Sequence, residues 1–246
     1  MAVSRRWRIG AGLLACALVA GAAVAWTSHG SGAVSAQKRP CLMLFTSLPI
    51  LWHEAPDLAA MLRTDAPPHW ARRALEARYT LVARDTLLAP PLDARFLLLA
   101  QPRPLAPQEN VALDDWVRAG GRLLLFADPM LTADSTYALG DRRRPQDIVL
   151  LSPILARWGL ELRFDEDQPA GEHDAARESA GAALPVNLPG QLAPRPGGHD
   201  ARCAIVREGL VARCRIGRGR ALIVADAALF EPSDADGKRA AVLDSL

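Results

Sequence analysis

Two short apolar segments of this chain share one pattern, and both end in an aspartate. The first runs from Gly121 to Asp128 and the second from Gly219 to Asp226, and each begins with Gly-Arg. Uninterrupted apolar runs of this length are typical of strands buried on both faces of a parallel sheet. Ligands collect outside the carboxyl ends of such strands. We therefore expect Asp128 and Asp226 to lie at a ligand-binding edge.

Strand-like and helix-like segments alternate along the rest of the chain. A helix is predicted over about 106–119, between strands at 95–100 and 122–127, which is the pattern of a right-handed crossover between parallel strands. Further strands are predicted at 41–47, 79–83, 160–164 and 220–225, and further helices at 68–78, 152–158 and 238–246. The pattern indicates one α/β domain over residues 40–246. Within it, residues 165–200 lack periodicity, and we expect an irregular excursion that is partly ordered at best.

Two cysteines are predicted to face each other in a hairpin near the C-terminus. Residues 202–207 and 210–216 have the pattern of two strands joined by a two-residue turn at Glu208-Gly209. Such a turn pairs residues whose numbers sum to 417, which sets Cys203 opposite Cys214. Opposed residues of an antiparallel pair lie within disulfide range. We therefore predict a disulfide between them, with two unbonded cysteines that face each other as the alternative.

The N-terminus has the pattern of a targeting segment. Arg5, Arg6 and Arg8 precede the apolar residues 9–26, which carry no polar stripe. This length is at the lower edge of the roughly 20 residues that span a bilayer, and the arginines favour a cytoplasmic N-terminus. We predict a signal anchor over 1–26, a linker over 27–39 and a main domain outside the cytoplasm. A signal peptide cleaved after Ala36 is the alternative.

Composition and motifs exclude several classes of function. A net charge of +2, with no basic stripe that interleaves aromatic residues, argues against a nucleic-acid partner. The cluster Arg142-Arg143-Arg144 is interpreted as a solvated loop, with a phosphate site as the weaker alternative. No glycine-rich phosphate loop, Gly-x-Ser-x-Gly elbow or zinc spacing occurs, so no cofactor and no metal are predicted.

The polar residues that follow the strands form the candidate site. Ser47, Trp52 and Glu54 follow the first strand and should share an edge with Asp128 and Asp226. The edge would comprise 47–57, 128–136 and 226–233. The two aspartates could act as a carboxylate pair if both are exposed and within about 6 Å of each other. The favoured interpretation is that each caps the segment that follows it.

A family resemblance rests on two stretches together with the N-terminal segment. They are Ala-Leu-Asp-Asp-Trp-Val-Arg-Ala-Gly-Gly-Arg-Leu-Leu-Leu-Phe-Ala-Asp-Pro and Gly-Arg-Gly-Arg-Ala-Leu-Ile-Val-Ala-Asp. The chain resembles membrane-anchored extracytoplasmic domains related to the gliding-motility ABC-transporter auxiliary family. The resemblance implies a flavodoxin- or Rossmann-like doubly wound fold, of the class I glutamine-amidotransferase type. It also implies a periplasmic domain on the inner membrane and an ABC permease as partner.

The same resemblance does not imply catalysis. Class I amidotransferases carry a nucleophilic cysteine after a central strand, but the turn after Phe126 reads Ala127-Asp128-Pro129-Met130. We therefore expect a non-catalytic binding or accessory domain. The alternative is a hydrolase that uses Asp128, Asp226 and a loop residue such as Glu54.

Overall fold

The computed structural model describes residues 39–246 except 56, 58, 60, 61, 63–66, 89–93, 176–182 and 231–236. The predicted anchor at 1–26, all but the last residue of the predicted linker, and residues 231–233 of the predicted edge lie outside the described residues. In the described part of the chain, no helix is both long enough and apolar enough to cross a bilayer.

A seven-stranded sheet forms the centre of the domain, in the order β2-β1-β3-β4-β11-β10-β9. Its strands are β1 (Cys41–Thr46), β2 (Thr80–Ala83), β3 (Phe96–Ala100), β4 (Arg122–Phe126), β9 (Ala201–Val206), β10 (Val211–Ile216) and β11 (Gly219–Val224). The five strands β2, β1, β3, β4 and β11 are mutually parallel. β10 pairs antiparallel with β11, and β9 pairs antiparallel with β10. The prediction of an α/β fold with a mostly parallel sheet is confirmed.

The order of the parallel strands reverses beside β1. The chain moves from β1 to β2 on one side, then crosses to β3 and β4 on the other side of β1. At such a reversal the connections leave the carboxyl ends of two neighbouring strands in opposite directions. This arrangement opens a crevice that commonly holds a ligand in open α/β sheets.

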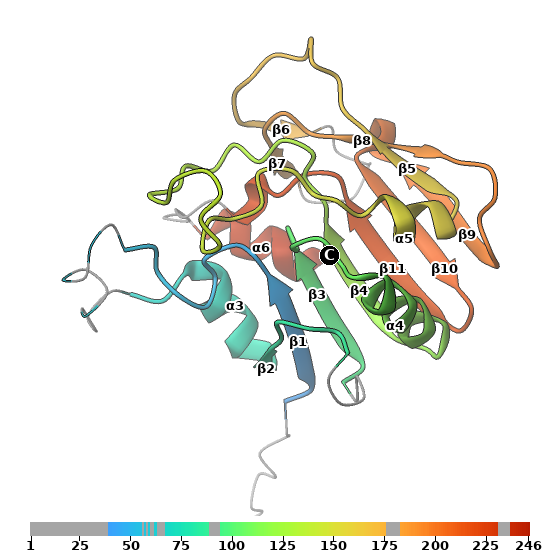
Figure 1. Ribbon diagram of the computed structural model, residues 1–246, viewed down its shortest axis with the longest axis horizontal. Helices are drawn as coiled ribbons and strands as arrows, with labels where there is room; N and C mark the ends of the chain where they lie inside the picture. Colours follow the sequence, from blue (N-terminus) through green and yellow to red (C-terminus); the bar gives the residue numbers. More distant parts are fainter. Residues whose placement is uncertain are drawn as a thin grey trace, which may run out of the picture. The chain divides into compact units, whose positions relative to one another are not determined.

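Helices cover both faces of the sheet. They are α3 (Trp70–Arg78), α4 (Pro107–Arg118), α5 (Ser152–Arg157) and α6 (Lys238–Ser245). Figure 1 shows α4 and α5 in front of the sheet and α6 behind it, and α3 contacts α6. The strands between them are apolar on both sides: Leu97, Leu98 and Leu99 of β3 are all at most 1% exposed.

The repeated Gly-Arg start of β4 and β11 has a steric cause. A Cβ atom added at Gly219 would lie 1.9 Å from the carbonyl oxygen of Val117, and one at Gly121 would lie 2.5 Å from the Trp116 ring. Both strands therefore begin where the C-terminal turn of α4 approaches their backbone too closely for a side chain. The shared pattern reports packing against α4.

Short strands lie within residues 165–200, where the sequence predicts an irregular excursion that is partly ordered. This region contains β6 (His173–Ala175), β7 (Leu184–Val186) and β8 (Gln191–Pro194). β8 pairs with β5 (Leu160–Arg163), and β6 pairs with β7. Each strand has only three or four residues, which is too short for a periodic pattern, and β8 pairs with a strand that lies before this region. Two short 3₁₀ turns, η1 (Arg207–Gly209) and η2 (Ala228–Phe230), complete the described elements.

The hairpin has the predicted register but a different turn. Cys203 pairs with Cys214 across β9 and β10, as the sum of 417 requires. The connection is the four residues 207–210 rather than a two-residue turn, because β9 ends at Val206 and β10 begins at Val211. Arg207 and Glu208 both adopt left-handed backbone angles, with φ of 51° and 55°. The turn is longer than predicted by one residue on each side. The numbers of paired residues therefore still sum to 417, and the pairing is unchanged.

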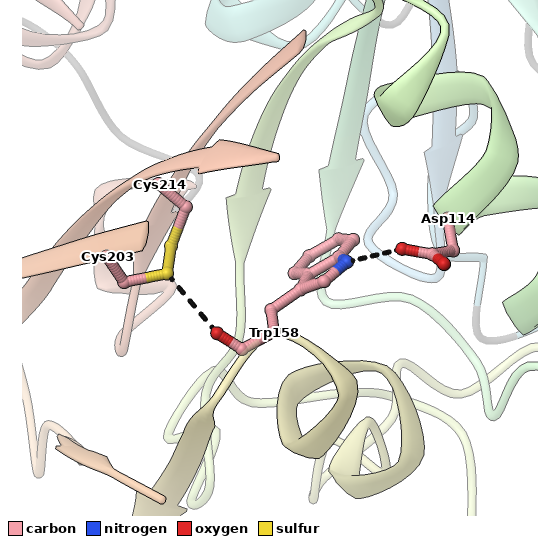
Figure 2. The surroundings of a disulfide bond; sticks show 4 residues. All are labelled: Asp114, Trp158, Cys203 and Cys214. Carbon is pink, nitrogen blue, oxygen red and sulfur yellow. Dashed lines mark hydrogen bonds between the residues drawn. A yellow bond between two sulfur atoms is a disulfide. The ribbon is translucent and has the colours of Figure 1, made fainter. Parts of the chain in front are cut away.

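A disulfide joins Cys203 and Cys214 and lies against a buried polar cluster (Figure 2). Cys203 Sγ lies 3.6 Å from the carbonyl oxygen of Trp158, whose Nε1 donates a hydrogen bond to Asp114 at 2.9 Å. Burial alone would raise the pKa of Asp114, but hydrogen bonds from Arg118, Arg157 and Trp158 hold it below its ordinary value. The cluster links α4, α5 and the hairpin. Among the described cysteines, Cys41 is the free thiol.

Removal of the disulfide should destabilise the domain without changing its fold. The bond closes a loop with a sequence separation of 11 residues, and its loss in Cys203→Ala/Cys214→Ala should lower the free energy of unfolding by about 2–3 kcal/mol. Urea unfolding measures this, with Cys41→Ala as a matched control. In protein from its native compartment, Cys203 and Cys214 should react with an alkylating reagent only after reduction. Alkylation of both before reduction would contradict the bond.

Candidate functional site

The two predicted aspartates lie buried at the carboxyl edge of the sheet, where each binds backbone N–H groups. Asp128 follows β4 and Asp226 follows β11, and they are 1% and 2% exposed. Their four carboxylate oxygens accept hydrogen bonds from the backbone N–H groups of Met130, Ala227, Ala228 and Asn187, at 2.6–3.0 Å. This geometry is that of caps and turns. A carboxylate pair that binds a ligand would have to be exposed, and neither Asp128 nor Asp226 is exposed.

The same two carboxyl groups affect each other's ionisation. Burial raises the pKa of Asp226 well above its ordinary value, and the charge of Asp128 raises it further, against the opposing effect of the hydrogen bonds from Asn187 and Ala228. Two neighbouring buried carboxylates cannot both ionise at low cost. The pairing of β4 with β11 brings Asp128 close to Asp226 and so accounts for the second of these two effects on the pKa.

A buried glutamine, which the sequence interpretation did not single out, connects the strands at this edge. Gln101 follows β3 with a left-handed φ of 44° and is fully buried. Its side-chain amide donates to the carbonyl oxygens of Asp128 at 3.0 Å and Gln146 at 2.8 Å, and its side-chain oxygen accepts from the backbone N–H of Asp128 at 2.9 Å. One side chain therefore holds the loop after β4 and the 142–146 segment together.

Ser47 belongs to the same network. Its hydroxyl donates to the carbonyl oxygen of Gln101 and accepts from the backbone N–H of Gln146 at 3.0 Å. The hydroxyl thus joins the end of β1 to β3 and to the 142–146 segment. Both of its hydrogen-bonding roles are filled within the fold, so it positions the wall of the site.

Glu54 connects two loops through hydrogen bonds, and Trp52 lines the cavity that is described in the next paragraph. The Glu54 carboxylate accepts from the Ser135 hydroxyl at 2.8 Å and from the Thr136 backbone N–H at 2.7 Å. It therefore connects the loop after β1 to the loop after β4. Trp52 is 37% exposed and lies on the cavity wall. Of the five predicted edge residues, Ser47 and Trp52 line this cavity, whereas Asp128, Asp226 and Glu54 do not.

The cavity, of about 740 Å³, opens at the carboxyl ends of β1 and β2, beside the reversal of strand order. Its wall combines apolar strand ends with loop residues that are mostly basic. The lining residues are Leu44, Phe45, Thr46, Ser47, Leu51, Trp52, Ala83, Arg84, Asp85, Arg103, Arg142, Arg143, Arg144 and Gln146. The charged residues on the wall are five arginines and one aspartate.

Three of the five arginines are paired with carboxylates. Arg103 forms two parallel hydrogen bonds of 2.8 Å with Glu109, and these hold the pKa of Glu109 down at about 2 despite its burial. The Arg103 guanidinium also lies 4.9 Å from the centre of the Phe45 ring. Arg143 pairs with Asp141, and Arg144 pairs with Asp147. These pairs fix the arrangement of the wall.

The other two arginines make no such pairs. Within the described residues, the side chains of Arg84 and Arg142 form no hydrogen bond or ion pair, and the Nε atom of Arg84 is buried without a partner. A buried donor without an acceptor costs about 1–3 kcal/mol. An anion bound between these side chains would supply the missing acceptor.

Sequence reasoning identified one part of this wall and missed another. Arg142–Arg144 were noted but interpreted mainly as a solvated loop, whereas the structure sets all three on the cavity. Arg84 and Arg103 were not singled out, although they lie one and three residues after β2 and β3. A search for charged residues directly after parallel strands would have found them. No group of three or more His, Cys, Asp or Glu side chains in the described ranges could hold a metal ion.

Comparison with known proteins found no relative in sequence: no protein-family model and no curated protein matches the chain. Among solved structures, exo-β-1,4-mannosidase Op5Man5 from Opitutaceae bacterium strain TAV5 superposes with a TM-score of 0.49 and 15% identity, over 86% of this chain and 36% of the mannosidase. This chain thus spans about a third of that enzyme's length.

Two smaller proteins superpose over most of their own length. A cytoplasmic protein from Salmonella typhimurium has a TM-score of 0.42 and 9% identity, over 84% of this chain and 96% of its own. A putative ThuA-like protein from Bacteroides uniformis has a TM-score of 0.39 and 12% identity, over 87% and 93%. Similarities at these scores carry no argument about function, which has to come from the site itself.

Replacement of Asp226 should change how the stability of the domain depends on pH. Because the folded-state pKa of Asp226 is raised from 3.8, the native state retains a proton that the unfolded state loses. The stability linked to this group is complete below about pH 4 and is lost as pH rises towards the raised pKa. Urea unfolding of Asp226→Asn across pH 4–8 should show a smaller loss of stability with rising pH than the native sequence. The control variant Asp115→Asn, at an exposed position, should show the same dependence of stability on pH as the native sequence. If Asp226→Asn also showed that dependence, the raised pKa of Asp226 would be contradicted.

Proposed function

We propose that this chain is a non-catalytic binding domain that takes a small anionic ligand in the arginine-lined cavity. The observation that carries the proposal is the pair of side chains from Arg84 and Arg142, which lack partners within the described residues on a wall already rich in arginine. Unpaired guanidinium groups at the reversal of a parallel sheet suit a ligand with phosphate or carboxylate groups.

The size and composition of the cavity support a small molecule. A volume of about 740 Å³ falls within the roughly 300–1,000 Å³ that is usual for such sites. Leu51, Phe45 and Trp52 supply apolar wall beside the arginines. A ligand with an anionic end and a planar or apolar body would use both parts of the wall.

The hydrolase alternative has less support. It needs Asp128 and Asp226 to reach a substrate, but both are buried and their oxygens already accept backbone hydrogen bonds. Glu54 is held by Ser135 and Thr136. Asp85 is the remaining carboxylate on the cavity wall. No nucleophile with an adjacent base stands out among the residues that line the cavity.

The proposal includes a flavodoxin- or Rossmann-like, doubly wound class for the fold. The order β2-β1-β3-β4-β11 supports it, because it matches the 2-1-3-4-5 order of flavodoxin-like sheets, whose ligand binds at the reversal between the first and third strands. The helices on both faces of the sheet also fit this class.

We place the domain in the periplasm, anchored by residues 1–26 in the inner membrane with a cytoplasmic N-terminus. The support is the apolar stretch 9–26 after three arginines, together with the disulfide, which suits an oxidising compartment. An accessory role beside an ABC permease follows from the resemblance to the gliding-motility auxiliary family. That role rests on analogy with the family and has its own test below.

Loss of the two unpaired arginines should weaken anion binding at least about tenfold while leaving the fold intact. Native protein should gain thermal stability with rising concentrations of inorganic phosphate or citrate. Arg84→Gln/Arg142→Gln should need at least about tenfold more of either anion for the same gain, since one lost charged contact costs about 1.4 kcal/mol or more. The control Arg163→Gln/Arg195→Gln removes the same charge away from the cavity. If phosphate or citrate stabilised the cavity variant and the control variant equally, the proposed anion site would be contradicted.

Partner capture tests the accessory role separately. Tagged full-length chain, solubilised from native membranes in detergent, should co-purify with an ABC permease or its ATPase, as identified by mass spectrometry. The Arg84→Gln/Arg142→Gln variant should still capture this partner if the cavity serves only a small ligand. Absence of any transporter subunit from the native sample would contradict the accessory role and leave the anion site to its own measurement.

A further inference from the structure

Four arginines form a single row across the outer half of the central sheet. The strand registers set Arg122 of β4 opposite Arg220 of β11, Arg220 opposite Arg215 of β10, and Arg215 opposite Arg202 of β9. Directly opposed residues point to the same face of a sheet. With neighbouring strands about 4.8 Å apart, the row is about 14 Å long. It lies on a different part of the molecule from the arginine-lined cavity.

The row is exposed and is not neutralised by its neighbours. All four arginines are exposed. Within the described part of the chain, the side chains of Arg202, Arg215 and Arg220 form no hydrogen bond or ion pair, and strands β4, β9, β10 and β11 contain no acidic residue. Like charges directly opposite each other destabilise a sheet. The repulsion within the row is therefore not offset by acidic residues on these four strands.

The surface around the row is an open hollow with little aromatic character. Arg213 lies on the same face two residues from Arg215, and Ala204 is its partner on β9. Four of these arginines (Arg202, Arg213, Arg215 and Arg220) line one open hollow of the sheet face. α6 approaches this face beside Leu124 and Leu222. Single-stranded nucleic acids bind sheet faces through stacked aromatic side chains. Among the described residues, the aromatic ring in contact with the row is Phe96, at its inner end beside Arg122.

The row lies at the end of the sheet where the chain enters the domain. Leu42, the second residue of β1, pairs with Phe96, and Phe96 pairs with Arg122. The row of arginines therefore continues the same line of residues that begins beside Pro40, whose carbonyl oxygen binds the N–H of Thr80 at this edge. The predicted linker 27–39 has thirteen residues, which reach at most about 45 Å when extended. That reach covers the whole width of the sheet.

We propose that this arginine face docks on the anionic phospholipid headgroups of the bilayer in which residues 9–26 are anchored. The docking rests on the anchor that forms part of the proposed function, but its surface is independent of the cavity. A row of exposed guanidinium groups on separate strands matches an array of several phosphates better than it matches one small anion. Each basic side chain close to an anionic bilayer raises membrane partitioning by roughly fivefold.

Residue-specific arginine modification tests the docking. Full-length chain is placed in nanodiscs of phosphatidylcholine alone or of an equal mixture with phosphatidylglycerol, treated with phenylglyoxal, and analysed by peptide mass spectrometry. Arg202, Arg215 and Arg220 should react at least threefold more slowly in the anionic nanodiscs, whereas Arg72 and Arg163 should react equally in both. Raising the ionic strength to about 1 M should remove the protection, because it shortens the Debye length to about 3 Å.

Matched variants separate docking from folding. In Arg202→Gln/Arg215→Gln/Arg220→Gln, protection of Arg122 and Arg213 should be lost, while the melting temperature stays equal or rises because opposed like charges have been removed. The control Arg72→Gln/Arg163→Gln/Arg195→Gln has the same net charge and should keep the protection. Equal reaction rates in the two nanodisc types would overturn the proposal. The proposal would also be overturned if an added single-stranded oligonucleotide protected Arg202, Arg215 and Arg220 in neutral nanodiscs as strongly as anionic lipid does.

A failure of the anchor gives a different result from a failure of the docking surface. If the chain does not enter nanodiscs, the proposed anchor is wrong. The same modification assay with vesicles of the two compositions then still tests the face: protection by anionic vesicles supports it, and unchanged rates overturn it. The anion titrations of the cavity variants are unaffected by either result.

Discussion

Buried polar groups at the carboxyl edge of the sheet must all find partners, and this constraint organises the rest of the structure. Gln101 meets it by binding Asp128 through both ends of its amide and by holding Gln146. Asp128 and Asp226 meet it by each accepting one backbone N–H of the segment that follows it and one from a segment distant in sequence. Each unmade bond would cost about 1–3 kcal/mol. The 142–146 segment is consequently held over the end of β1, where it closes the cavity.

The arginines of this chain fall into two groups with different physical roles. Arg103 with Glu109, and Arg118 and Arg157 with Asp114, are bonded to carboxylates that are almost fully buried, and they join separate elements. Breaking such a pair would leave a buried charge uncompensated. Arg84 and Arg142 on the cavity, and the row on the outer strands, have no such partners among the described residues. Positive charge that the fold does not use is available for ligands of opposite charge.

Parts of this description could be predicted because they depend on local sequence. The capping role of Asp128 and Asp226 follows from aspartate placed directly after a strand, and the pairing of Cys203 with Cys214 follows from the arithmetic of a hairpin. The turn of that hairpin was predicted two residues too short, since β9 ends one residue earlier and β10 begins one residue later than predicted. The strands between 165 and 200 were missed because each is too short to show a period.

The amino-acid sequence by itself determined the α/β class, the mostly parallel sheet and the positions of most of its strands, because buried strands need continuous apolar runs. Only the tertiary structure decided which charged residues come together. Arg84, Arg103 and Arg142 share a cavity because strand order reverses beside β1, and Arg122, Arg202, Arg215 and Arg220 share a row because of the strand registers. Strand order and register arise from contacts between distant segments, which no local pattern of residues encodes.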